Sequence, residues 1–152
     1  CALPICYRDA LDLIHESATH MSLSVNVCLQ LHSMLYRYLP QNGGSWKKTD
    51  NEIVERLPDG AVARVRFRAV SAVATPQAME QLAATYGAAV NEYAKEPLLV
   101  VPLAILDFLC IHPFSDGNGR VSRLLTLMLL YHFGHEVFSR GRLRPENGRA
   151  TD

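Results

Sequence analysis

Residues 111–125, IHPFSDGNGRVSRLL, bring several chemically active side chains close together. His112 is the group in this stretch that can take a proton near neutral pH. Asp116 offers a hard carboxylate oxygen, which suits Mg²⁺ held between a protein and phosphates. Arg120 and Arg123 stand one helical turn apart, so both guanidinium groups leave one helix face and can grip phosphate oxygens. The stretch therefore indicates a site for a phosphorylated ligand and a divalent cation beside a base.

The glycines of this stretch support the same interpretation. Gly117 and Gly119 allow the backbone to approach a ligand without obstruction by side chains. They lie where a helix is expected to begin, so unpaired N–H groups and the positive end of the helix dipole face the loop, and such a site favours phosphate. The stretch lacks the lysine and Ser/Thr of a P-loop and follows a helix, which disfavours a P-loop NTPase.

The composition favours a single small globular domain. The chain has 152 residues, enough for one hydrophobic core, and about half of them are hydrophobic. Fifteen basic residues balance fifteen acidic ones, so no overall field would attract nucleic acid or an anionic membrane. We therefore expect neither a nucleic-acid partner nor a membrane partner.

Cysteine usage and the apolar runs indicate a cytoplasmic protein. The four cysteines have no paired short spacing, which is typical of free thiols in a reducing compartment. The longest apolar run, residues 98–111, is too short to span a bilayer and contains Pro102 and Asp107. No signal peptide is visible at the start of the chain. We expect this run to be a core helix.

Hydrophobic periodicity predicts a mainly α-helical bundle with one β-hairpin. The expected helices cover residues 7–18, 24–39, 75–94, 98–111 and 120–133, and the expected strands cover residues 51–57 and 61–70. Ser24 and Thr75 are suited to cap the second and third helices, with Pro76 at the first position of the third. Because an isolated hairpin is marginally stable, we expect it to lie on the helical body.

The ends of the chain suggest a domain with a truncated start. The sequence begins at Cys1 without a methionine, and residues 139–152 are polar and basic without an apolar period. We expect a domain over residues 1–138, whose N-terminal boundary is truncated, and a polar tail over residues 139–152.

The stretch HPFSDGNGRVSR resembles the Fic signature HxFx(D/E)GNGRxxR at every fixed position. The resemblance extends from about Trp46, through the hairpin, to about Phe133. It implies a Fic-type helical bundle with a β-hairpin flap. It also implies transfer of AMP from ATP to a Ser, Thr or Tyr hydroxyl of a target protein, with Mg²⁺ as cofactor.

The resemblance further implies a role for each residue of the signature. His112 would be the base that deprotonates the attacking hydroxyl, and Asp116 would hold Mg²⁺. Phe114 would anchor the loop to the helical body. An anion hole formed by Gly117, Asn118 and Gly119 would bind the nucleotide phosphates. Arg120 would contact the phosphates as well, and Arg123 would bind the γ-phosphate.

The hairpin resembles the flap with which Fic proteins pair the backbone of their target as an added strand. The residues expected to dock the target are Arg68, Ala69, Val70 and Ser71. Arg64, Arg66 and Arg68 also form a basic face on the second strand, and an ordinary solvated face is favoured slightly over target contact.

Two alternatives stay open from the sequence. Related Fic proteins transfer phosphate or other phosphate-containing groups, and a truncated Fic module could be catalytically silent and act in binding or regulation. Many Fic proteins also carry an inhibitory helix with the pattern (S/T)xxxE(G/N). The nearest approach is RLRPEN, where Arg142 replaces Ser or Thr before Glu146. An inhibitory helix is therefore expected upstream of Cys1 or on another protein.

Two pairs, Cys28 with His32 and His132 with His135, have spacings that metal ligands can adopt. No further zinc-type ligand stands near either pair in the sequence. Packing or surface roles are therefore favoured for both.

Overall fold

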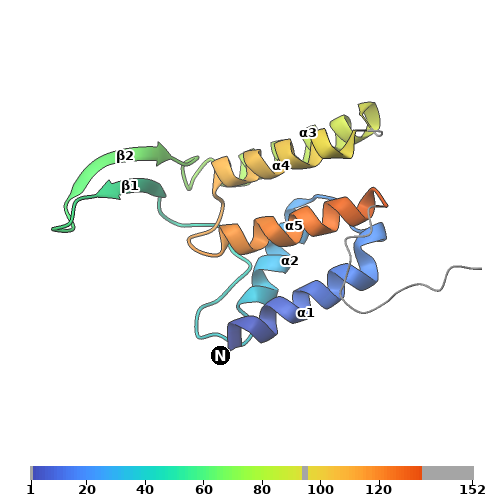
Figure 1. Cartoon of the computed structure of the whole chain (residues 1–152), viewed down its shortest axis with the longest axis horizontal. Coiled ribbons are helices and arrows are strands. Elements are labelled where there is room, and N and C mark those ends of the chain that lie inside the picture. The colour runs from blue at the N-terminus through green and yellow to red at the C-terminus, as the bar shows by residue number, and fades with distance from the viewer. Residues whose placement is uncertain (1, 94–95, 135–152) are drawn as a thin grey trace, which may run out of the picture.

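The computed structural model describes residues 2–93 and 96–134. This part of the chain is mainly helical, with one two-stranded antiparallel sheet, which confirms the predicted fold class (Figure 1). The elements in chain order are α1 (Ala2–Ser17), the 3₁₀ helix η1 (Ala18–His20), α2 (Val25–Leu35), β1 (Glu52–Arg56), β2 (Val62–Arg68), α3 (Thr75–Glu92), α4 (Pro97–Ile111) and α5 (Asn118–His132).

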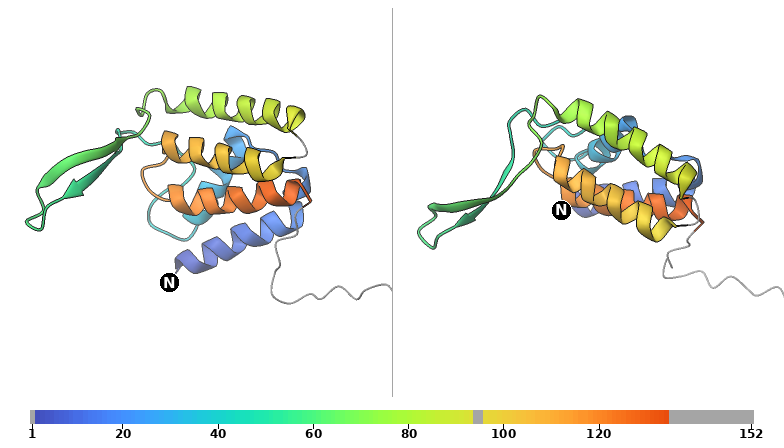
Figure 2. Two further views of the ribbon diagram at one scale, coloured as in Figure 1. Left: turned by 45° about the horizontal axis from the view of Figure 1, so that its top comes forward. Right: turned by 90° about the horizontal axis from the view of Figure 1, so that it is seen from above.

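Helix α5 lies at the centre of the bundle because it packs against helices on several sides. It contacts α1, α2 and α4, while α3 covers α4 on the far side from α5 (Figure 2). Its apolar residues recur on almost every face, as expected for a surrounded helix. The side chains of α5 that are fully buried are Val121, Leu124, Leu125, Met128 and Leu129.

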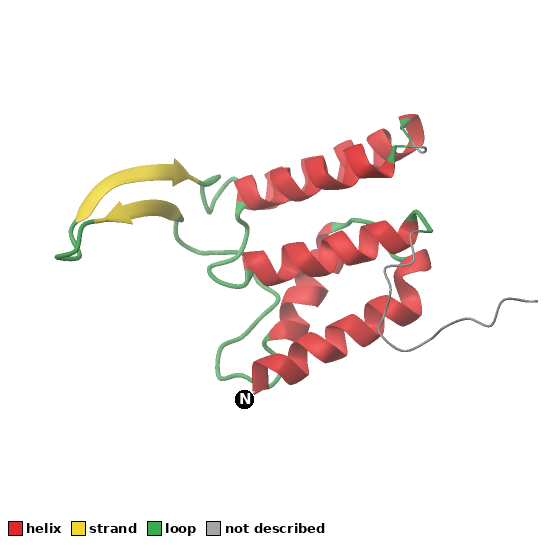
Figure 3. Ribbon diagram, viewed as in Figure 1, coloured by secondary structure: helices red, strands yellow, loops and turns green. Residues whose placement is uncertain are grey.

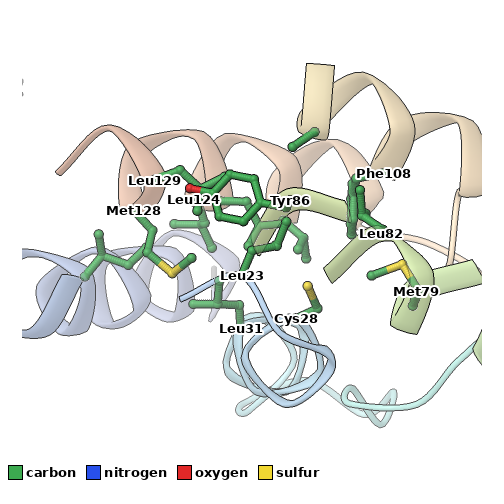
Figure 4. Close-up of a cluster of buried hydrophobic side chains, with 14 of the residues drawn as sticks. Leu23, Cys28, Leu31, Met79, Leu82, Tyr86, Phe108, Leu124, Met128 and Leu129 are labelled. Carbon is green, nitrogen blue, oxygen red and sulfur yellow. The ribbon is translucent and has the colours of Figure 1, made fainter. Parts of the chain in front are cut away.

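The hydrophobic core joins side chains from all five α-helices of the described residues. Leu31 of α2, Met79 of α3 and Phe108 of α4 meet the buried face of α5 (Figure 4). Helices α4 and α5 run antiparallel, so the turn between them lies at the end of the bundle from which the hairpin projects (Figure 1). The core therefore fixes the two helices that flank the HPFSDGNGR stretch.

The ends of helices α2 and α3 agree with the sequence-based prediction only in part. Ser24 caps α2 as expected, since its Oγ accepts the Val27 N–H at 3.3 Å. The prediction for Thr75 was wrong: it is the first residue of α3, and its hydroxyl donates to the Ser71 carbonyl at 2.8 Å. Helix α2 also ends at Leu35, four residues earlier than predicted.

The hairpin pairs as predicted but does not lie on the helical body. Glu52 pairs with Arg68 and Glu55 with Arg64, with two register irregularities between the strands. Among the described residues, the strands pair with each other while their backbones approach no helix, and Figure 3 shows the hairpin projecting from the bundle. Val65 and Phe67 of β2 are each 37% exposed. The expectation of a hairpin packed on the helices was therefore wrong.

No helix in the described part of the chain combines the length and apolarity needed to cross a membrane. Residues 98–111 fall within α4, and one face of this helix is buried in the core. The other face carries exposed leucines such as Leu103, which is 54% exposed.

The packing predicts very different costs for two leucine truncations. Leu124→Ala removes a fully buried side chain from α5 and should lower the free energy of unfolding by about 2–5 kcal/mol. Leu103→Ala on the exposed face of α4 should change it by less than about 0.5 kcal/mol. Urea unfolding of both variants measures the difference, and equal costs would contradict the central position of α5.

Candidate active site

His112 terminates α4 in a strained backbone conformation. Its φ of 52° and ψ of 60° lie in the left-handed region, and it is the only described residue other than glycine with positive φ. Its N–H still donates to the Phe108 carbonyl at 3.0 Å, so the residue closes the helix and turns the chain. Such a conformation persists when surrounding contacts enforce it.

Lys47 supplies the contacts that enforce this turn. Its Nζ donates to the Ile111 carbonyl at 3.1 Å, and its backbone N–H donates to the Pro113 carbonyl at 2.9 Å. The residue is only 3% exposed. Burial lowers the pKa of the Lys47 ammonium, although the charge of Asp50 opposes this shift. Lys47 thus holds the chain on both sides of His112.

Phe114 anchors the loop in the body of the protein, as expected. Its side chain is fully buried and stacks on the His32 ring, with centroids 3.8 Å apart and planes inclined by 6°. Trp46 and Phe108 complete the aromatic contacts at 5.3 Å and 6.3 Å. The loop therefore contributes a side chain to the core between two catalytic candidates, His112 and Asp116.

Asn118 closes the loop on itself. Its Oδ1 accepts the Phe114 N–H at 2.9 Å, and its Nδ2 donates to the Phe114 carbonyl at 2.7 Å. Asn51 donates to the same carbonyl at 2.9 Å. Because the Asn118 side chain is engaged in this way and 2% exposed, its contribution to an anion hole would come from the backbone at the start of α5.

Asp116 is held by two side chains at one carboxylate oxygen. Its Oδ2 accepts hydrogen bonds from the Tyr36 hydroxyl at 2.6 Å and from Arg120 Nη2 at 2.7 Å, and Arg120 also donates to the Tyr36 hydroxyl at 2.9 Å. The hydrogen bond from Tyr36 is the main reason that the pKa of Asp116 is lowered. Burial, followed by the bond to Asp116, raises the pKa of Tyr36 to about 12.

His32 holds the backbone of Asp116 through a hydrogen bond. Its Nδ1 accepts the Gly44 N–H at 2.8 Å, so its Nε2 carries the proton and donates to the Asp116 carbonyl at 3.1 Å. Among the described residues both members of the Cys28 and His32 pair are buried, with Cys28 fully inaccessible and His32 5% exposed, as the predicted packing role requires. The pair formed by His132 and His135 extends outside those residues.

The two glycines of the motif have different reasons to be glycine. Gly117 has a φ of 86°, and an added Cβ would lie 3.1 Å from the Tyr36 hydroxyl, so conformation and space both exclude a side chain. At Gly119 an added Cβ would meet only the Arg123 guanidinium, at 3.9 Å. The backbone of Gly119 is therefore open to a ligand, whereas Gly117 serves the turn.

Two cavities meet at His112. A cavity of about 300 Å³ is lined by His112, Ser115 and the motif residues Asp116, Gly117, Asn118, Gly119, Arg120 and Arg123. A second cavity of about 360 Å³ is lined by the same His112 and Ser115 together with Asp50, Asn51, Glu52, Phe67 and Ala69. The structure thus gathers the predicted phosphate-binding residues in one cavity and opens His112 toward the hairpin in the other.

Arg123 is exposed, and its side chain makes no hydrogen bond or ion pair with any residue that the structure describes. Glu146, the nearest candidate for an inhibitory glutamate, lies outside the described residues. Of the flap residues, Ala69 lines the second cavity, while Arg68 pairs with Glu52 at 3.1 Å. Ser71 faces the start of α3 instead, where its Oγ accepts the Ala74 N–H at 3.3 Å.

Sequence reasoning missed the residues that support the loop from a distance. They are His32, Tyr36, Lys47 and Asn51. Their separations from the partners in the motif run from 63 to 84 residues, and no local pattern marks them. The available signal was indirect: a histidine and a tyrosine one helical turn apart, at the end of a helix that precedes a glycine-rich loop.

The helical bundle, the hairpin and the loop at the start of α5 together define a Fic fold. Residues 22–130 match the Fic/DOC family model, and the chain therefore belongs to the Fic/DOC family. This confirms the resemblance seen in the HPFSDGNGRVSR stretch.

Solved structures show the same fold. A Fic domain containing signaling protein from Bacteroides thetaiotaomicron is 25% identical, with a TM-score of 0.71 over 86% of this chain and 47% of that chain. A Fic family protein from Desulfovibrio desulfuricans G20 is 23% identical, with a TM-score of 0.61 over 84% of this chain and 36% of that one. The chain thus spans less than half the length of these two structures.

Two further similarities differ in how much of the chain they cover. The BepC protein of Bartonella tribocorum, solved with bound AMPPNP, is 17% identical, with a TM-score of 0.57 over 86% of this chain and 69% of that chain. A ribonucleoside-diphosphate reductase small chain of Ostreid herpesvirus 1 (isolate France) is 49% identical over 41 residues. That match covers 27% of this chain and 7% of the viral protein, too little to indicate a shared fold.

The environment of His32 predicts that acid destabilises the fold. Burial is the main cause that lowers the pKa of His32, so the folded protein keeps the imidazole neutral while the unfolded chain protonates below about pH 6.5. The contribution is therefore complete above about pH 6.5 and decreases as the pH falls toward the lowered pKa. His32→Gln, which does not titrate, should show a smaller loss of stability than the parent chain between about pH 7 and pH 5.

Urea unfolding at a series of pH values measures this dependence. His20→Gln is the matched control, because His20 is exposed and should leave the pH dependence unchanged. An unaltered acid loss in His32→Gln would show that other groups cause it.

Proposed function

We propose that this chain is the core of a protein adenylyltransferase, which transfers AMP from ATP to a Ser, Thr or Tyr hydroxyl of a target protein. The observation that carries the proposal is the position of His112 between two cavities. One cavity is lined by the residues suited to phosphates and the other by the hairpin. A base in this position can serve a donor on one side and an acceptor on the other. We further propose that residues 1–138 form this catalytic unit.

The donor cavity suits the phosphates of a nucleoside triphosphate. The N–H groups of Asn118 and Gly119 precede the first hydrogen bonds of α5, so they and the helix dipole favour an anion. Arg120 and Arg123 line the same cavity and add two positive charges. We assign the phosphates next to the reacting phosphorus to Arg120 and the terminal phosphate to Arg123, whose guanidinium has no carboxylate partner among the described residues.

Asp116 has the chemistry to hold magnesium. Its side chain is 76% exposed and lines the donor cavity, while both hydrogen bonds from Tyr36 and Arg120 go to Oδ2. Oδ1 is therefore the oxygen that can serve as a ligand. Mg²⁺ in nucleotide sites commonly takes one or two carboxylates together with phosphate oxygens and water, so a single carboxylate fits. The ion would neutralise charge on the phosphates when bound.

His112 would act on the acceptor and not on the donor. It takes the proton of the target hydroxyl as the oxygen forms a bond to the α-phosphorus. The bond between that phosphorus and the oxygen bridging to the β-phosphate breaks, and pyrophosphate leaves. The arginines and the start of α5 stabilise the negative charge that moves onto the leaving phosphates. The fixed turn around His112 keeps the base in place during this step.

The hairpin offers an edge to which a target segment can add. The Ala69 N–H donates to the Asn51 carbonyl at 3.2 Å, so the N–H of Arg68, which pairs with Glu52, points away from β1. The Val70 N–H makes no hydrogen bond with any described residue. An extended segment that pairs there would pass the second cavity, which Ala69 and His112 both line. The expected target is therefore a protein with a hydroxyl side chain in an extended stretch.

The cysteines of the described residues support a reducing compartment. Cys6, Cys28 and Cys110 are free thiols, and burial raises the pKa of Cys28 to about 12. We infer a cytoplasmic location for the chain.

The His112→Ala variant tests the proposed base. Transfer should fall at least ~10²-fold, because general-base assistance to the hydroxyl is lost. Affinity for ATP should be nearly unchanged, since this side chain does not bind the donor. Incubation with a cell lysate and ATP labelled on either the α- or the γ-phosphate measures transfer, and calorimetry measures binding.

The position of the label also separates the alternatives. Label from the α-phosphate on a protein supports adenylyl transfer, whereas label from the γ-phosphate indicates phosphate transfer. Binding of ATP without any label on protein indicates a silent module. Near parental transfer by His112→Ala would remove His112 from the mechanism.

The Val70→Pro variant tests the docking edge. Proline removes the Val70 N–H, which makes no hydrogen bond with any described residue, so no bond between the strands is lost. Loss of one hydrogen bond to the target should lower protein modification about 2- to 10-fold. Affinity for ATP should persist.

Val70→Ala is the matched control, because it keeps the N–H and removes only the side chain that packs against the core. Modification should be higher in Val70→Ala than in Val70→Pro. Equal losses in both variants would mean that the side chain and not the backbone edge matters.

A further inference from the structure

Arg120 is positioned to interact both with Asp116 and with a phosphate bound in the donor cavity. Its Nη2 atom donates to Asp116 Oδ2 at 2.7 Å, yet Arg120 also lines the cavity proposed for the phosphates. Phosphate oxygens are strong acceptors and would draw the guanidinium group toward themselves. When Arg120 turns toward bound phosphates, Asp116 loses the hydrogen bond from Arg120. In the proposed function the same carboxylate then has to bind the metal.

Tyr36 is the second partner of that carboxylate and has no competing demand. Its hydroxyl donates to Asp116 Oδ2 at 2.6 Å, which is the shorter of the two contacts at this oxygen. A hydroxyl that donates to Asp116 can still accept from Arg120, so the contact survives movement of the arginine. Neither side chain donates to Oδ1.

The position of Tyr36 is fixed by its surroundings. The residue follows the last turn of α2 and is only 7% exposed. Its ring lies 4.8 Å from the His32 ring, and the backbone at Gly117 lies so close that an added Cβ would be 3.2 Å from the tyrosine ring. The hydroxyl therefore stays in place without help from Asp116 or Arg120.

We propose that Tyr36 is a positioning residue that holds Asp116 by Oδ2 and so presents Oδ1 to magnesium when Arg120 engages the phosphates. This inference rests on the proposed function, since it takes Asp116 as the metal ligand. Tyr36 touches neither metal nor nucleotide in this role. It acts by restricting the rotation of one carboxylate in an otherwise exposed position.

A purely structural tyrosine would behave differently. If the hydroxyl served only to stabilise α2 against the loop, its removal would lower stability and would leave the magnesium dependence of nucleotide binding unchanged. If it positions Asp116, its removal acts on binding in the presence of magnesium and spares binding in its absence. The ratio of the two affinities separates these roles.

The test uses Tyr36→Phe, which keeps the ring in place and removes only the hydroxyl. Affinity for AMPPNP is measured by calorimetry with magnesium and with EDTA. A hydrogen bond to a charged group is lost, so the affinity gain from magnesium should be at least ~10-fold smaller than in the parent chain. Tyr38→Phe is the matched control, because Tyr38 is 52% exposed and its hydroxyl makes no hydrogen bond with Asp116. The magnesium gain of this variant should equal that of the parent.

Asp116→Ala, measured in the same way, separates the role of Tyr36 from the assignment of Asp116 as the metal ligand. Loss of the magnesium gain in Asp116→Ala and in Tyr36→Phe supports the proposal. Loss in Asp116→Ala with a full gain in Tyr36→Phe overturns the role of Tyr36 and leaves the metal assignment intact. A full gain in Asp116→Ala overturns the metal assignment, and the role of Tyr36 falls with it.

Discussion

The turn between α4 and α5 has to reverse the chain within a few residues, and its carbonyl oxygens lie beyond the regular hydrogen bonds of either helix. Buried carbonyls without partners are costly, so this turn depends on donors from elsewhere in the chain. Helix α2, the segment that leads to β1 and Asn118 at the start of α5 supply them. Lys47 donates to the carbonyls of Ile111 and Pro113. Asn51 and Asn118 donate to the Phe114 carbonyl, and His32 donates to the Asp116 carbonyl.

This constraint explains how an open site can be rigid. The functional groups Asp116 and Arg123 are exposed, as a site that admits a large ligand requires. The atoms that hold them in place are buried: Phe114 is fully buried, and His32 is 5% exposed. The Asp116 side chain is 76% exposed and that of Arg120 is 23% exposed, so solvent reaches the pair and allows it to exchange partners. Rigidity therefore comes from the supporting layer, and freedom remains where ligands bind.

The sequence predicted the helical bundle, the hairpin and the motif residues of the candidate site, because helical spacing, alternation and the HPFSDGNGR pattern are local signals. It could not predict that the hairpin projects from the body, since an amphipathic pattern does not say what covers its apolar side. Lys47 and Tyr36 escaped prediction for a related reason. A lysine and a tyrosine are ordinary surface residues until tertiary packing buries them against a loop 64 or 80 residues away.

The proposed nucleotide site consists of the start of α5 and the fixed loop before it. Amide hydrogen exchange, followed with and without AMPPNP and magnesium, measures this directly along the chain. Binding should slow exchange at residues 116–120, while the hairpin tip at residues 57–61 should exchange at an unchanged rate. Saturating nucleotide, verified by calorimetry, with no slowing at residues 116–120 would contradict the assignment of this site.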